Sequence, residues 1–103
     1  MTARMTDDAE LVREVVDEFL SDIPRQIEKL KGALAAGDHR AAERQAHSIK
    51  GAAANVAAEA LRAVASAMEE AGKAGNMATV QAMVPQIESE FGRLREMILR
   101  ERP

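Results

Sequence analysis

The residues of this sequence best suited to chemistry, His47, Lys50 and Gly51, lie within five positions of one another. In an α-helix they share a face, because residues three and four positions apart lie one above the other. A neutral imidazole is nucleophilic near pH 7, and a lysine one turn away can offset negative charge on a group that the ring receives. A glycine inside a helix costs about 1 kcal/mol relative to alanine. We therefore interpret Gly51 as clearance for another molecule that approaches His47.

The sequence contains two histidines, His39 and His47. A histidine on the exposed face of a helix is most often a solvated polar residue, and His39, in the first turn of its predicted helix, fits that description. His39, Glu43 and His47 lie at i, i+4 and i+8, a spacing that also suggests a metal site. That stripe drifts by about 40° per step and points away from the predicted core, which weakens the metal interpretation.

Two further interpretations of His47 involve catalysis or group transfer. A general base in a hydrolase would need a nucleophile, an orienting carboxylate and an oxyanion hole in a pocket, and an alanine-lined helix face offers no pocket. A histidine that accepts a phosphoryl group needs none of these, because the donor's active site would supply the metal and the carboxylates. Only this last interpretation accounts for His47, Lys50 and Gly51 together.

Four amphipathic segments must position this face. Apolar residues recur in each at intervals of three or four, and glycine, aspartate and asparagine between them act as stop and start signals. The segments are residues 7–36, 39–56, 59–73 and 77–99. Short connections pack successive helices antiparallel. The sequence therefore predicts a single domain, residues 1–103, that is all-α and forms an antiparallel up-and-down four-helix bundle.

Prolines and glycines modify this outline. Pro24 removes a backbone donor within the first segment and predicts a first helix that is kinked or split there. Pro85 predicts a bend in the last helix, and Gly72 and Gly75 are expected to loosen the end of the third. Because Leu11 and Val15 widen the apolar stripe of the first segment, we expect its beginning to fold partly over the end of the bundle rather than along one seam.

Composition excludes several classes of protein. The chain has 103 residues, of which 47% are apolar and only two are aromatic, and its formal charge is −3. That charge provides no basic surface for a nucleic acid. Without cysteine the chain has no disulfide and no thiolate metal site. No apolar run approaches the roughly 20 residues of a membrane span or the core of a signal peptide. We expect a soluble, cytoplasmic monomer that binds neither nucleic acid nor membrane.

The sequence around His47 resembles the signature of histidine-containing phosphotransfer (HPt) domains, H-S-[LI]-K-G-x-x-x-N. The matching stretch is His47-Ser48-Ile49-Lys50-Gly51-Ala52-Ala53-Ala54-Asn55. A first helix interrupted by proline, Gly37-Asp38 before the histidine helix and Met68-Glu69 in the third helix extend the resemblance over nearly the whole chain. Such domains are four-helix bundles that shuttle phosphoryl groups between aspartates of receiver domains.

The resemblance implies a role for each residue of the motif. His47 would be the phospho-acceptor, Lys50 would support the charge of the phosphoryl group, and Gly51 would provide clearance. One residue departs from the family pattern: Ala57 stands where the family usually has a glycine two residues after the asparagine. The turn between the second and third helices is therefore expected to differ.

This resemblance also implies partners. The chain would be a phosphocarrier rather than an enzyme, exchanging phosphate with receiver domains of response regulators or of a hybrid sensor histidine kinase. It would need no cofactor of its own, with Mg²⁺ bound by the partner receiver domain. The alternative is a helical adaptor that keeps the bundle but carries no phosphate. The expected docking surface comprises Arg40, Glu43, Arg44, His47, Lys50, Gly51 and Ala54.

Overall fold

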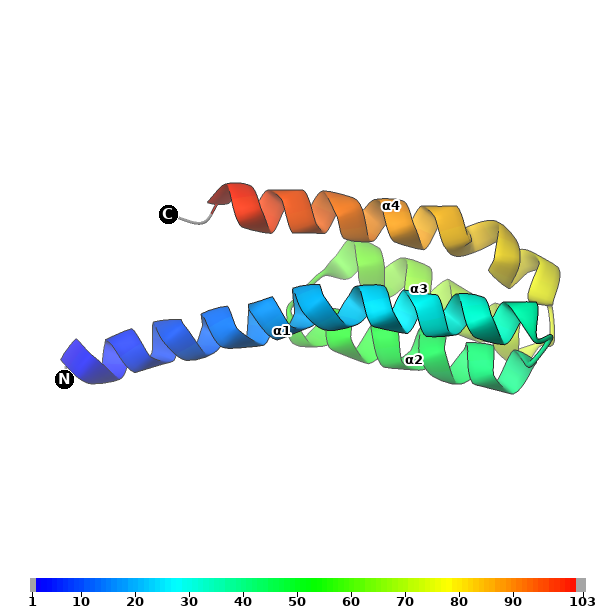
Figure 1. Cartoon of the computed structure of the whole chain (residues 1–103), viewed down its shortest axis with the longest axis horizontal. Coiled ribbons are helices and arrows are strands. Elements are labelled where there is room, and N and C mark those ends of the chain that lie inside the picture. Colours follow the sequence, from blue (N-terminus) through cyan, green and yellow to red (C-terminus); the bar gives the residue numbers. More distant parts are fainter. Residues whose placement is uncertain (1, 102–103) are drawn as a thin grey trace.

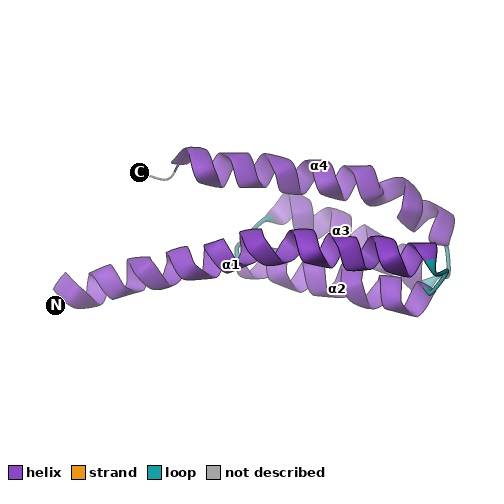
Figure 2. Cartoon of the chain, viewed as in Figure 1, coloured by secondary structure: helices purple, strands orange, loops and turns teal. Residues whose placement is uncertain are grey.

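The computed structural model describes the backbone of residues 2–101 and the side chains of residues 9–101. Over that range it contains four helices and no strand: α1 (Thr2–Ala35), α2 (His39–Asn55), α3 (Glu59–Lys73) and α4 (Met77–Glu101) (Figure 1). The short connections between them lie at the two ends of the bundle (Figure 2). Each helix packs against its two neighbours in the ring α1–α2–α3–α4–α1. The predicted all-α, up-and-down four-helix bundle is confirmed.

The buried side chains lie at the spacing that the sequence predicts. Each helix contributes one stripe of residues three or four positions apart, because only one face of a helix turns toward the core. The rings of Phe19 on α1 and Phe91 on α4 have centroids 6.2 Å apart and are tilted by 54°, a favourable aromatic arrangement that joins these two helices. The largest fully buried side chains are Ile23, Leu30, Ile49, Leu61, Met68, Val80 and Ile87.

Of the two outcomes predicted for the first helix at Pro24, a kink or a split, the split is not found. Helix α1 continues unbroken through Pro24, and Figure 1 shows only a shallow change of direction along it. Pro24 is exposed, so its missing N–H lies on the solvent side, where water can hydrogen-bond to the carbonyl that it frees. Packing of Ile23 and Ile27 on either side then holds the helix together. In α4, the turns before Pro85 are inclined to the rest of the helix, as the sequence predicts (Figure 1).

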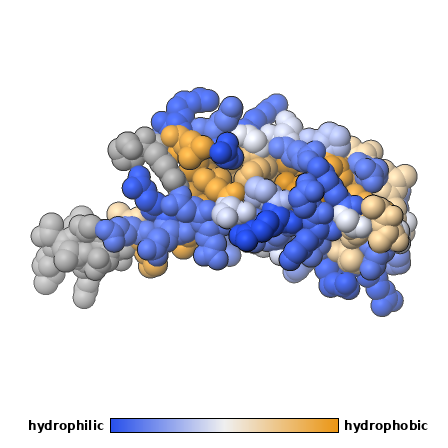
Figure 3. All heavy atoms as spheres, viewed as in Figure 1, coloured by the Kyte–Doolittle hydropathy of each residue, from blue (hydrophilic) through white to orange (hydrophobic). Residues whose placement is uncertain are grey.

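The beginning of α1 does not fold over the end of the bundle. It projects past the turn between α2 and α3 (Figure 1), and Leu11 and Val15 are exposed. The physical reason is length: α1 has 34 residues, whereas α2, which packs against it, has 17 and ends at Asn55. The end of α4 also extends past that turn, and Figure 3 shows apolar side chains between the two projecting helices.

All three connections use the same backbone turn. Gly37, Ala57 and Gly75 each have a positive φ, of 70°, 57° and 73°. In each turn the N–H groups of this residue and of the next bond back to carbonyls of the preceding helix, which is the Schellman arrangement. The departure at Ala57 therefore leaves the turn in the conformation that a glycine would adopt, contrary to expectation. An alanine in this conformation is strained by about 1–2 kcal/mol.

Replacing Ala57 with glycine is expected to stabilise the protein. Relief of the strain outweighs the greater flexibility of glycine in the unfolded chain, so the free energy of unfolding should rise by up to about 1 kcal/mol. Ala82→Gly is the matched control, because Ala82 is an exposed residue inside α4, and it should lower the same quantity by about 1 kcal/mol. Chemical denaturation measures both. A less stable Ala57→Gly protein would show that the turn is not strained.

Candidate functional site

Helix α2 turns one face to the core and presents His47 on the other. Ala42, Ala46, Ile49 and Ala53 are buried, and Asp38 caps the helix by accepting a hydrogen bond from the N–H of Ala41 at 3.1 Å. The His47 side chain is 67% exposed. Since the inward alanines are small, the α2 backbone lies close to its neighbours, and His47 stands at the surface on a rigid support.

The side chain that organises this face comes from α3. Glu69 is buried, with only 7% of its side chain exposed. Its Oε2 lies 2.8 Å from Nδ1 of His47, and its Oε1 lies 2.5 Å from Nζ of Lys50. Oε2 therefore hydrogen-bonds to the ring of His47, and Oε1 forms an ion pair with Lys50 on the same helix. The structure brings His47 and Lys50 together through an acid that lies 22 residues from the histidine in sequence.

The charge of Glu69 determines which nitrogen of His47 can react. The ammonium of Lys50 lowers the pKa of Glu69 below its ordinary value; burial opposes this effect, and the hydrogen bond to His47 adds to it. The carboxylate is therefore ionised at neutral pH and can only accept a hydrogen bond. In the neutral ring Nδ1 must then carry the proton. The lone pair is left on Nε2, the ring nitrogen that does not contact Glu69.

The residues predicted to surround His47 are only partly assembled into one site. Glu43, Arg44, His47 and Glu69 line a shallow hollow of about 460 Å³. Arg40 and Ala54 are also exposed on α2 but do not line this hollow. At Gly51, an added Cβ atom would meet no atom within 4 Å. The fold itself therefore leaves the space above this glycine open.

Neither a metal site nor a membrane segment is found among the described residues. No three potential ligand side chains there lie close enough together to hold a metal ion, and that includes His39, Glu43 and His47. None of the described helices is long and apolar enough to cross a membrane.

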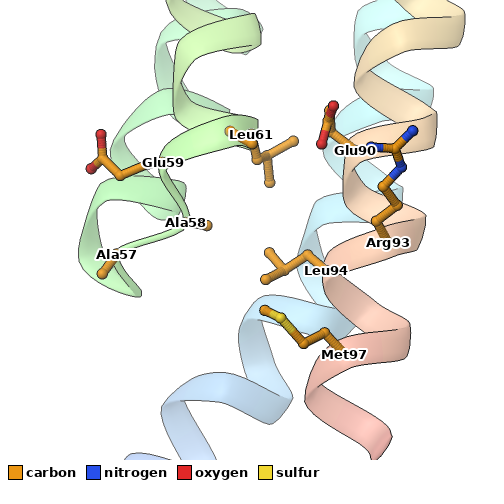
Figure 4. A pocket seen from close by; sticks show the side chains of 9 residues that line it. Ala57, Ala58, Glu59, Leu61, Glu90, Arg93, Leu94 and Met97 are labelled. Carbon is orange, nitrogen blue, oxygen red and sulfur yellow. The ribbon is translucent and has the colours of Figure 1, made fainter.

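A second hollow lies elsewhere on the bundle. It has a volume of about 230 Å³ and opens between the start of α3 and the later turns of α4, where Leu61, Leu94 and Met97 form its apolar walls (Figure 4). Glu90 and Arg93 are also among the residues that line it. Its lining does not include His47, Lys50 or Gly51 of α2, so this hollow is separate from the His47 site.

Sequence reasoning did not assign a role to Glu69. A signal for it exists: Ala65 and Glu69 are one turn apart, so the glutamate falls on the buried stripe of α3, next to Met68. A carboxylate at such a position must have partners, because burying an unpaired charge is very costly. The sequence therefore indicates that Glu69 has partners. Their identity depends on how α2 and α3 align.

The state of Glu69 predicts how stability depends on pH. The pKa of Glu69 in the folded protein lies below the ordinary value of 4.5. The ionised carboxylate therefore adds to the free energy of unfolding above pH 4.5, and this added stability is lost as the pH falls through the lower pKa of the folded state. Glu69→Gln removes the titration. The stability advantage of the wild type over Glu69→Gln should therefore be constant near neutral pH and shrink in acid.

Urea denaturation at a series of pH values between about 3 and 7 measures this difference. Glu70→Gln is the matched control, since Glu70 is the exposed neighbour on the same helix. The free energy of unfolding of Glu70→Gln, plotted against pH, should run parallel to that of the wild type. A wild-type advantage over Glu69→Gln that did not change in acid would contradict the assigned charge state.

Comparison with known proteins agrees with the geometry. The family model of the Hpt domain matches residues 14–98, which include His47, Lys50, Gly51 and Glu69. The crystal structure of histidine-containing phosphotransfer protein B (HptB) from Pseudomonas aeruginosa PAO1 is similar, with 30% sequence identity and a TM-score of 0.83 over 95% of this chain and 90% of that one. No curated protein matches the chain by sequence. The chain belongs to the Hpt domain family, the phosphocarriers of histidine phosphotransfer in phosphorelays.

Proposed function

We propose that this chain accepts a phosphoryl group on Nε2 of His47 from the phosphorylated aspartate of one receiver domain and passes it to another. The supporting observation is the contact between Nδ1 of His47 and the buried Glu69 carboxylate, at 2.8 Å. This contact orients the ring and keeps the lone pair on the other nitrogen. The nucleophile is therefore prepared before any partner binds.

The transfer of the phosphoryl group needs no additional proton donor or acceptor. Nε2 attacks the phosphorus of the aspartyl phosphate, the N–P bond forms as the acyl-phosphate P–O bond breaks, and the electron pair leaves with the aspartate carboxylate. The ring keeps its proton on Nδ1 and gains positive charge. Glu69, which already accepts that proton's hydrogen bond, stabilises this charge. Transfer to the next receiver reverses these changes.

The remaining residues on this face would serve the partner. The open space above Gly51 admits a receiver's surface close to the histidine. Arg40, Arg44 and Lys50 suit the acidic residues of a receiver active site, which would also hold the Mg²⁺. Lys50, three residues from His47 and paired with Glu69, would stabilise the phosphoryl oxygens.

His47→Gln tests the identity of the acceptor. The variant should take up no acid-labile phosphate from a panel of phosphorylated receiver domains. Its free energy of unfolding should change by no more than about 1 kcal/mol, because the glutamine amide can still donate to Glu69 and the site is exposed. His39→Gln, on the same helix, is the control and should be labelled as the wild type is. Phosphate on the His47→Gln protein would rule out His47 as the acceptor, and a wild type labelled by no receiver would favour the adaptor.

Lys50→Ala and Arg44→Ala separate chemistry from docking. A charge that acts on the phosphoryl group inside the interface is poorly screened, whereas steering between exposed charges fades beyond about 8 Å at physiological salt. Single-turnover transfer at saturating receiver should be slowed by about tenfold or more in Lys50→Ala, at low and high salt alike. The Arg44→Ala defect should disappear at saturating receiver. A Lys50→Ala defect that also disappeared there would assign the lysine to docking.

A further inference from the structure

Helix α3 approaches α2 closely at Gly72, one turn away from the hydrogen bond between Glu69 and His47. Gly72 is buried, and a Cβ atom placed on it would lie 3.2 Å from both Cα and Cβ of Glu43 and 3.3 Å from its backbone nitrogen. Two of these three atoms belong to the α2 backbone, which cannot move aside as the end of a flexible side chain can. An alanine at this position would therefore require the two helices to separate by a few tenths of an ångström.

The same pair of helices carries the contact between His47 and Glu69. Glu43 lies one turn before His47 on α2, and Glu69 lies one turn before Gly72 on α3. Because the helices are antiparallel, Gly72 faces Glu43 while Glu69 reaches His47. The separation of the helices at Gly72 therefore bears directly on the distance between Nδ1 and the carboxylate, only one helical turn of about 5 Å away.

Gly72 is not needed for the backbone turn that follows it. Among the described glycines only Gly37 and Gly75 have a positive φ, and Gly75 forms the turn between α3 and α4. Gly72 lies within α3, where alanine would be the better helix former. Helix α3 continues through Gly72 and ends at Lys73, where the sequence predicts its end. What distinguishes the position is the missing side chain.

We propose that Gly72 is a positioning residue for phosphotransfer: its lack of a side chain sets the separation of α2 and α3 at which Glu69 bonds directly to Nδ1 of His47. The proposal rests on the proposed role of His47. If the Glu69 carboxylate moves away from His47 by a few tenths of an ångström, their charge-assisted hydrogen bond loses its alignment. The ring is then free to turn and to place its proton on Nε2, which removes the nucleophilic lone pair from the exposed nitrogen.

Gly72→Ala tests this on the ring itself and on the reaction. The ¹⁵N chemical shifts of the His47 ring, measured at alkaline pH where it is neutral, report which nitrogen carries the proton. The wild type should show mainly the Nδ1–H tautomer, and Gly72→Ala should shift the population toward Nε2–H. Phosphotransfer at saturating receiver should slow by about threefold or more, since displacements of this order cost rate without abolishing binding. Gly92→Ala, in α4 with open space around it, is the matched control and should change neither readout.

Both measurements are repeated in an Ala57→Gly background, in which the turn after α2 is relieved of strain. Unchanged tautomer and rate in a folded Gly72→Ala protein would overturn the proposal. So would a Gly72→Ala protein that unfolds in both backgrounds, because the glycine would then serve the fold alone. The tautomer measurement needs no partner, so it decides the role of Gly72 even if no receiver labels the wild type and the proposed function fails.

Discussion

The buried carboxylate of Glu69 links the packing of this protein to its chemistry. Removing a carboxylate from water is costly, and the cost is offset only where both oxygens find good partners. Here one oxygen meets the ammonium of Lys50 and the other meets the ring of His47. Because both partners come from α2, the ion pair that makes the burial of Glu69 tolerable is connected to the hydrogen bond that prepares the histidine. Any change in the separation of α2 and α3 affects both.

The residues between α2 and α3 are suited to holding that separation. Ala42, Ala46 and Ala53 are fully buried on α2, and Ala65 and Gly72 are buried on α3. Small side chains let the backbones approach, and a close-packed seam of this kind has little freedom to adjust. The large apolar side chains lie mainly on α1 and α4 and fill the rest of the core. The bundle thus combines a thin, stiff pair of helices that carries the site with a thicker pair that provides most of the buried volume.

The three connections show how one backbone solution can be reached with different residues. The turn before α2 has glycine at the left-handed position followed by a capping aspartate, and the turn before α4 has glycine followed by asparagine, whose side chain accepts from Thr79. The turn before α3 has two alanines, so it is strained at Ala57 and has no side-chain cap at Ala58. Tertiary packing of α2 on α3 holds this turn closed although its own residues favour it least.

Local periodicity alone determined the four helices and most of the residues that they bury, since a 3.6-residue repeat and capping residues act over a few turns. It also placed His47, Lys50 and Gly51 on one face. The tertiary structure decided what depends on distant parts of the chain. The pairing of Glu69 with His47 follows from how two antiparallel helices align. The exposure of Leu11 and Val15 follows from α1 being longer than the helices beside it. The continuity of α1 through Pro24 follows from the packing around that residue. Local sequence encodes none of these relations, because each is a distance between helices rather than a spacing along one.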